Sequence, residues 1–490
     1  MRGFLASSIG VTCAAALALP LTPPAAAASA RPALGAETAR SAEAVAVGSA
    51  VRRADAGAYV PGSTQSLPLA PLTRDRAVGD PDEQGLPRRD VRHFSLVGVI
   101  WDDPAVELHG RVQVRTRAVA TGTWSGWQDV ETHNAEHAAD PGTAESGSGV
   151  RGSTAPLWVG ESDGVQVRVT PESAEPRPEE GPEGGDDSAV DPAAVTPLPA
   201  GLHLELVDPG GPAPAQGEPG PALGEPGPRP GSLNPDTVGA AESLAASAAN
   251  AELAPLGAAE IPALGRAETE RELLALRGNE LTQEQRAKPY IGPRPRIVTR
   301  RGWGANEKWR ERQFAYTKKV KVAWVHHTAS GGKYWCTQTP SLIRGIYRYH
   351  VLSMGWRDIG YNFLVDKCGN IYEGRAGGVA KAVLGAHTRG FNTNSMGIAV
   401  LGSFGSSKPT AASVRAIARL TAWKLGLYGA NPRGKTYLTS GGGNLYRKGK
   451  NVRLNVISGH RDGFSTECPG RLLYLKLGSA RASAARFQGR

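Results

Sequence analysis

Alternating apolar and polar residues predict a small all-β domain between residues 89 and 208. The alternation is clearest at 94–100, 112–116, 165–169 and 202–206. Successive side chains of a strand point to opposite faces, so period-two runs separated by turn residues indicate a half-buried antiparallel sheet, which we interpret as sandwich-like. An acidic Pro/Gly/Ala stretch at 172–199 interrupts these runs, and we expect it to be a disordered surface insertion.

From residue 291 to residue 478, strand patterns alternate with helical ones. One strand is predicted to lead into His326 and His327, and others cover 359–366, 371–373, 396–401 and 455–458. A helix is predicted to start at Thr339-Pro340 and a longer one at Thr410, because threonine is a good N-cap and proline suits the first helical position. Alternating elements of this kind predict an α/β fold with a mixed central sheet flanked by helices.

The remaining segments lack sustained periodicity. Residues 1–30 have a basic start, an apolar run and small residues at its end, which is typical of a signal peptide. A membrane anchor is the alternative, but Pro20, Pro23 and Pro24 break the run and no later stretch is long enough to span a bilayer. We therefore expect a protein that is secreted or attached to the cell wall. The other predicted segments are a disordered arm at 31–88, a Pro/Gly/Ala linker with a lead-in helix (266–277) at 209–290, and a basic tail at 479–490.

Charge separates the two halves of the chain. The net charge is +10, but residues 291–490 contain 34 Lys and Arg against 7 Asp and Glu, whereas the rest contains 22 against 39. A secreted domain with so many positive charges would be attracted to a polyanion. The chain has no helix-turn-helix, RNA-binding or zinc-finger pattern, so nucleic acid is disfavoured and anionic cell-wall polymers are the better candidate. A basic stretch at 433–453 has the pattern of an inserted hairpin, which either contacts such a polymer or is a solvated loop.

Histidine and cysteine residues in the last third of the chain suggest a metal site. One of His326 and His327 can face such a site, since neighbours in a strand point to opposite faces. His460 and Cys468 lie eight residues apart across a Gly/Ser-rich loop, and Pro469 suggests that Cys468 caps a helix, where its thiol pKa would be lowered. Two imidazoles and one thiolate suit Zn²⁺ and leave a fourth position open, as in catalytic zinc sites. Packed polar residues are the alternative.

If Cys468 binds metal, Cys336 and Cys368 remain as an even pair that can form a disulfide in an oxidising compartment. The alternative is a third cysteine ligand and a free thiol. Trp124, Trp127 and Trp158 of the β domain either stack on sugar rings or pack in the core, and core packing is favoured because tryptophan is mostly buried in proteins.

Residues 300–477 resemble the peptidoglycan recognition protein and type 2 N-acetylmuramoyl-L-alanine amidase family. The segments that carry the resemblance occur in the family's order and spacing: RRGWGA at 300–305, VHHTAS at 325–330, GWRDIGYNFLVD at 355–366, IYEGR at 371–375, GAHTRGFNTNSMGIAVLG at 385–402 and GHRDGFSTECPG at 459–470. They span somewhat more than a third of the chain and leave the β domain without an assignment.

The resemblance implies a role for several residues. His326, the first histidine of HHT, would be a zinc ligand together with His460 and Cys468, and Tyr361 and Thr466 would be the catalytic pair. Family members that bind peptidoglycan without cleaving it lack the cysteine, so Cys468 favours the catalytic branch. His387 is a candidate for contacting substrate.

The resemblance therefore implies a zinc-dependent hydrolase that cuts the amide between the lactyl group of muramic acid and L-alanine in bacterial peptidoglycan. We expect the chain to act as a monomer. Two alternatives stay open: a non-catalytic peptidoglycan-binding protein, and a zinc peptidase that cuts within the stem peptide. The HExxH pattern of common zinc peptidases is absent from the sequence.

Overall fold

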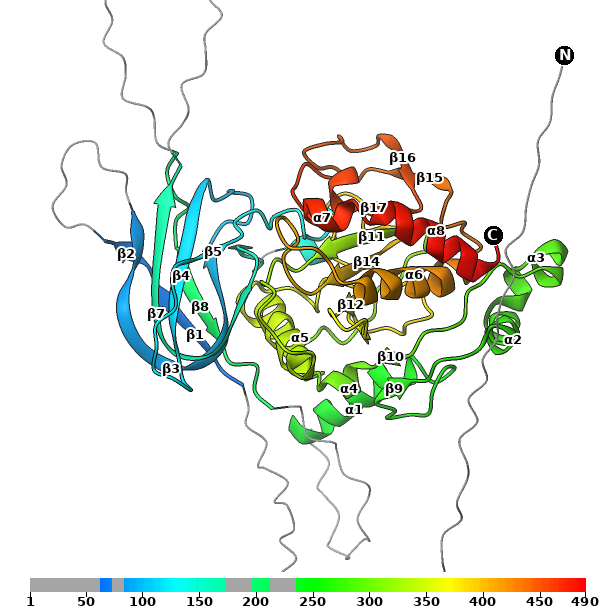
Figure 1. Cartoon of the computed structure of the whole chain (residues 1–490), viewed down its shortest axis with the longest axis horizontal. Coiled ribbons are helices and arrows are strands. Elements are labelled where there is room, and N and C mark those ends of the chain that lie inside the picture. The colour runs from blue at the N-terminus through cyan, green and yellow to red at the C-terminus, as the bar shows by residue number, and fades with distance from the viewer. Residues whose placement is uncertain (1–61, 73–82, 148, 173–195, 212–234) are drawn as a thin grey trace, which may run out of the picture. The chain divides into compact units, whose positions relative to one another are not determined.

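The computed structural model describes residues 62–72, 83–147, 149–172, 196–211 and 235–490 (Figure 1). The predicted signal peptide, most of the predicted arm and insertion, and residues 212–234 of the predicted linker lie outside these ranges. Among the described residues, none of the helices is both long and apolar enough to cross a membrane.

The N-terminal module is an antiparallel sheet of eight strands. The strand order is β1-β8-β3-β7-β4-β5, and β2 and β6 also pair with β3. The bounds are β1 Thr64–Pro68, β2 Ala70–Pro71, β3 Gln84–Trp101, β4 Gly110–Ala118, β5 Gln128–Val130, β6 Gly152–Ser153, β7 Leu157–Pro171 and β8 His203–Val207. The predicted all-β class is confirmed, and the four predicted runs lie in β3, β4, β7 and β8.

Bulges in the long strands let this sheet curve around one apolar interior. The pairing of β3 with β7 shifts register at three places, and shifts of this kind bend a strand and increase its twist. Figure 1 shows β3, β4 and β7 curving together. Their inward residues, with those of β8, form a buried cluster that includes Phe94, Val112, Val167 and Leu204.

The start of this module differs from the prediction of an arm up to residue 88. Strand β1 pairs with β8 in continuous register, from Thr64 opposite Val207 to Pro68 opposite His203. Residues 64–71 and 84–88 therefore belong to the sheet. The strand pattern was missed because proline removes backbone donors and is depleted in strands, although edge positions such as β1 tolerate it.

The C-terminal module has a mixed sheet of seven strands in the order β17-β11-β14-β12-β13-β10-β9. Strands β17, β11, β14 and β12 are parallel to one another, whereas β13 is antiparallel to β12. The bounds are β9 Glu260–Ile261, β10 Ile297–Val298, β11 Val322–His327, β12 Phe363–Val365, β13 Ile371–Glu373, β14 Ser395–Val400 and β17 Ile457–Gly459. The predicted mixed α/β class is confirmed.

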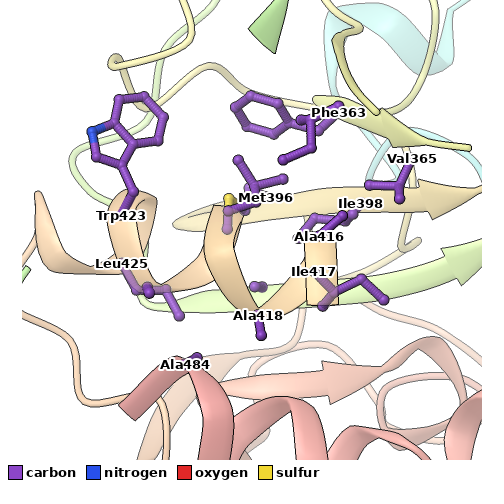
Figure 2. Packing of buried hydrophobic residues seen from close by; sticks show 14 of the residues in the cluster. Phe363, Val365, Met396, Ile398, Ala416, Ile417, Ala418, Trp423, Leu425 and Ala484 are labelled. Carbon is purple, nitrogen blue, oxygen red and sulfur yellow. The ribbon is translucent and has the colours of Figure 1, made fainter. Parts of the chain in front are cut away.

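Helices cover both faces of this sheet. The described helices of this module are α1 Pro235–Ala248, α2 Arg266–Arg277, α3 Gln283–Ala287, α4 Arg300–Trp303, α5 Thr339–Arg348, α6 Ala411–Gly426, α7 Arg471–Tyr474 and α8 Leu477–Gln488. The hydroxyl of Thr410 accepts a hydrogen bond from the backbone N–H of Ser413, so it caps α6 as predicted. Figure 2 shows α6 packed on the sheet through Ala416 and Ile417, close to Met396 and Ile398 of β14.

On the opposite face, helix α5 lies between the two modules. Leu342, Ile343 and Ile346 belong to a buried cluster that contains Leu364 and Ala399 of the central sheet. The same cluster contains Leu96 and Ile100 of β3, so this helix packs on the sheet and on the N-terminal module at once.

Two segments predicted as linker and tail are part of the C-terminal module. Within 209–290, β9 pairs with β10, and Leu253, Ile261 and Leu273 lie in the core beneath α6. The predicted tail at 479–490 lies mostly in helix α8, whose Ala480 and Ala484 are buried in the same core. The sequence does not predict that these segments belong to the core, because they contribute few and small apolar residues to it. Proline, alanine or arginine dominates each segment and hides the apolar periodicity.

The predicted basic hairpin is present. Strands β15 Lys435–Thr439 and β16 Asn451–Asn455 form a two-stranded antiparallel sheet. Leu438, Val452 and Leu454 pack against Trp324 and Phe391, so the hairpin has one apolar face and is more than a solvated loop.

Cys336 and Cys368 form a disulfide that ties the turn before α5 to the turn between β12 and β13. We predict that replacing both cysteines with serine lowers the free energy of unfolding by about 3 kcal/mol, because the bond closes a 32-residue separation in the unfolded chain. Urea denaturation of the purified variant measures this change. A loss below about 1 kcal/mol would show that the bond contributes little to the stability of this module.

Candidate metal centre

Two neighbouring parallel strands place His326 and His460 side by side. In the pairing of β11 with β17, Val325 lies opposite Gly459, so the next residue of each chain segment is one of these histidines. Both rings are completely buried, and their Nδ1 atoms are 3.2 Å apart. His327, the next residue on β11, is not part of the cluster of close ligand atoms. The ambiguity between the two histidines is therefore resolved by strand geometry.

Cys468 reaches the same point from the loop that follows His460. Its Sγ lies 3.7 Å from the Nδ1 of His326, and its side chain is buried. The predicted capping role differs from the structure, because α7 starts at Arg471 and Gly470 is its N-cap residue. Without a helix N-terminus at the sulfur, burial dominates and raises the thiol pKa well above its usual value.

A fourth group, not foreseen from the sequence, completes the cluster. His137 follows β5 of the N-terminal module, and its Nε2 lies 3.3 Å from both the Sγ of Cys468 and the Nδ1 of His460. The ligand atoms of His137, His326, His460 and Cys468 all lie within 4.8 Å of one another.

Four of these separations are close to the edge lengths of a zinc coordination tetrahedron. Zinc bonds of about 2.0–2.1 Å to nitrogen and about 2.3 Å to sulfur give edges of about 3.3 Å between nitrogens and about 3.5 Å between nitrogen and sulfur. The four separations given above, from 3.2 to 3.7 Å, are close to those values. Three imidazoles and one sulfur are a donor set that zinc accepts, so the residues fit the metal.

The protonation state of the rings also suits a cation. Burial lowers the pKa of His326 and of His460 well below the usual value, and it lowers the pKa of His137 to about 4. The imidazoles are therefore neutral near pH 7, and neutral imidazole is the form that binds metal. A positive ion would supply the charge that the buried thiolate needs.

A buried hydroxyl orients His326 from behind. Thr388 Oγ1 lies 3.3 Å from the Nε2 of His326 and 3.0 Å from the Nδ1 of His387. With its Nδ1 facing the other ligands, His326 donates from Nε2 to Thr388, whose own proton points to His387. Hydrogen bonds of this kind fix the ring and tautomer of a metal-binding histidine.

His387, the candidate for substrate contact, is completely buried. In this arrangement it supports Thr388 and lines no surface that a polymer could reach. The other two residues taken from the resemblance lie at the cluster. The ring of Tyr361 has its centroid 5.6 Å from that of His326, and the hydroxyl of Thr466 accepts from the backbone N–H of Cys468 at 3.1 Å.

Comparisons with known proteins connect this arrangement to a family. The family model described as N-acetylmuramoyl-L-alanine amidase matches residues 316–471. Peptidoglycan-recognition protein SC2 of Drosophila simulans is 35% identical over 176 residues, which are 36% of this chain and 80% of that protein. The human N-acetylmuramoyl-L-alanine amidase is 34% identical over 140 residues, 28% of this chain and 22% of that protein.

The chain belongs to the peptidoglycan recognition protein and type 2 amidase family. Among solved structures, Drosophila PGRP-LB is 26% identical, and the match covers 37% of this chain and 92% of that one with a TM-score of 0.30. The N-terminal module matches a different family model, described as Rv3811 N-terminal galactose-binding domain-like, over residues 52–192. This family member therefore carries a second module that supplies His137.

The tryptophans of that module give no sign of a sugar platform. Trp158 is buried, and the rings of Trp124 and Trp127 are partly buried and covered by arginines, with the guanidinium of Arg88 5.0 Å from the first and that of Arg168 4.4 Å from the second. The packing role that the sequence favoured fits these positions.

We predict that Thr388→Val weakens zinc binding by about 10-fold or more, because His326 loses the hydrogen bond that fixes its ring. Competition with a chromophoric chelator measures the affinity. Thr393→Val is the matched control, because it is the same substitution at a nearby threonine whose side chain is exposed. Equal affinities of the two variants would show that Thr388 does not support the metal ligand.

Proposed function

We propose that the chain is a secreted, zinc-dependent N-acetylmuramoyl-L-alanine amidase that hydrolyses the bond between the lactyl group of muramic acid and L-alanine. The observation that carries the proposal is the meeting of His326 on β11, His460 just after β17 and Cys468 in the following loop, with the Nδ1 of His326 3.2 Å from that of His460 and 3.7 Å from the Sγ of Cys468. Family membership supports the reaction, and the N-terminal sequence pattern together with a disulfide supports secretion.

A zinc ion held by these residues would supply Lewis acidity toward water and the scissile carbonyl. Tyr361 adds a hydrogen-bond donor. Burial raises the pKa of its phenol well above the usual value, so the group keeps its proton at neutral pH and can donate to the oxygen on which negative charge develops. Thr466 orients the loop, because its hydroxyl accepts the backbone N–H of Cys468.

No carboxylate of the C-terminal module is placed as a general base among the described residues. Burial raises the pKa of Glu373 to about 7, but this carboxylate is occupied by the side chain of Asn250 and the backbone N–H of Arg300. Glu467 pairs with Arg461 on the surface. Proton transfer in the proposed reaction therefore depends on water, Tyr361 and groups of the substrate.

The excess of positive charge in the C-terminal half supports a substrate that is surrounded by polyanions. The C-terminal half carries the excess of lysine and arginine, while peptidoglycan lies among anionic wall polymers. Attraction of this kind raises the rate of encounter and declines with salt, whereas the specificity of cleavage comes from the site itself.

Cys468→Ser removes the sulfur ligand, and we predict that it lowers amidase turnover by about 100-fold or more and lowers bound zinc well below one ion per chain. Metal content is measured by atomic emission, and turnover by mass spectrometry of purified peptidoglycan after digestion. The expected product is a peptide with a new L-alanine amino terminus. Cleavage only within stem peptides would support the zinc peptidase instead, and tight binding with no cleavage by any variant would support a binding protein.

Tyr361→Phe tests the donor role separately from metal binding. We predict a fall in kcat of about 100-fold with unchanged zinc content, because one donor to the developing oxyanion is lost. Tyr334→Phe is the control, since Tyr334 is also buried but bonds to the backbone of Lys367, away from the cluster. A loss of zinc in Tyr361→Phe would contradict a purely catalytic role.

A further inference from the structure

The segment 131–147 of the N-terminal module covers the candidate metal centre. It follows β5 and is attached to the loop 387–392 of the C-terminal module by hydrogen bonds. The backbone N–H of Arg389 donates to the carbonyl of Glu136 at 2.9 Å, and the Nδ2 of Asn392 donates to the carbonyl of Ala138 at 2.9 Å. These two bonds bracket His137 and hold it over the cluster.

Charged side chains of the same segment strengthen the attachment. Asp140 is buried, and its Oδ1 accepts from the backbone N–H of Gly390 at 2.8 Å and from the Nδ2 of Asn392 at 2.7 Å. Glu145 forms a buried ion pair with the guanidinium of Arg375, one of whose bonds measures 2.9 Å. Charge-assisted bonds between buried groups are among the stronger polar contacts in proteins.

Glu136 and His137 contact two parts of the proposed active site, the hydroxyl of Thr466 and the ligand atoms of His460 and Cys468. The hydroxyl of Thr466 donates to the Oε1 of Glu136 at 2.6 Å. The Nε2 of His137 lies beside the other three ligand atoms, 3.3 Å from the Nδ1 of His460 and from the Sγ of Cys468. A catalytic zinc site has three protein ligands and an open position, whereas four protein ligands close the coordination shell.

We propose that His137 is a fourth zinc ligand and that the described arrangement is a latent form of the enzyme, closed by its own N-terminal module. The proposal rests on the amidase function proposed above. Activation requires the segment 131–147 to withdraw, which exchanges one neutral imidazole for water at the metal and breaks no covalent bond. Because the segment is part of the same chain, its local concentration at the site is high, and substrate must compete with it.

The origin of the ligands distinguishes this arrangement from a purely structural zinc site. Three ligands and Tyr361 belong to the region matched by the amidase family model, and only His137 comes from the region matched by the other model. The three-ligand set is thus complete without the N-terminal module. His137, the proposed fourth ligand, comes from the other module and would occupy the coordination position that water needs.

The test counts histidine ligands directly in the full chain. Zinc is replaced by Co²⁺, and the exchangeable imidazole N–H protons that are shifted by the paramagnetic ion are counted by proton NMR. We expect three shifted signals in the unchanged protein and two in His137→Ala. His133→Ala is the matched control: it lies four residues earlier in the same segment, its side chain is 73% exposed, and it should keep three signals.

Hydrolysis of purified peptidoglycan is measured on the zinc forms of the same proteins. We expect His137→Ala to be about 10-fold or more faster than the unchanged protein, and His133→Ala to be equal to it. Asp140→Ala is a second variant that leaves all four ligands in place and loosens the segment by removing its bonds to Gly390 and Asn392, and it should also be faster. Thermal unfolding identifies any variant that has lost its fold.

The outcomes separate this inference from the proposed function. Two shifted signals in the unchanged protein, or three in His137→Ala, would refute His137 as a ligand whatever the activities are. Two signals in His137→Ala without faster hydrolysis than an active unchanged protein would refute the latent form. Loss of one signal with no cleavage by any variant would support His137 as a ligand while refuting the amidase function.

Discussion

The parallel pairing of β11 with β17 is the constraint on which the candidate centre depends. Because Val325 lies opposite Gly459, the residues that follow them, His326 and His460, lie side by side near the carboxyl ends of the two strands. Strand β14 pairs with the other side of β11, from Val322 opposite Ser395 to His327 opposite Val400, and so prevents β11 from slipping. A shift of one residue would turn His326 to the other face and bring His327 to the cluster in its place.

Burial gives the cluster its chemical character. Dry surroundings keep the imidazoles neutral, keep the phenol of Tyr361 protonated, and make a lone buried thiolate unfavourable. A cation bound by the neutral imidazoles would compensate the charge of that thiolate. Hydrogen bonds from His326 to Thr388 and from Thr388 to His387 then hold the ring of His326 in place from the side away from the cluster.

Much of this picture could be predicted from the sequence, because its signals are local. Strand alternation and the threonine cap of α6 identified the elements, and the spacing of His460 and Cys468 placed two candidate ligands within one loop. His137 could not be found in this way, since more than 300 residues separate it from His460 and Cys468 and only tertiary packing brings them together. The same limit applies to α8 and β9, whose few inward residues are recognisable only once the core that they complete is known.

The four ligand positions have a consequence for how the protein unfolds. His137, His326 and the pair His460 and Cys468 come from three distant parts of the chain and from both modules. An ion bound to all four, as proposed above, would act as a cross-link that exists only in the native state, and the stability of the two modules would then rise with the free zinc concentration. Because the modules also share the buried cluster around α5, zinc would add to a contact that already exists without it.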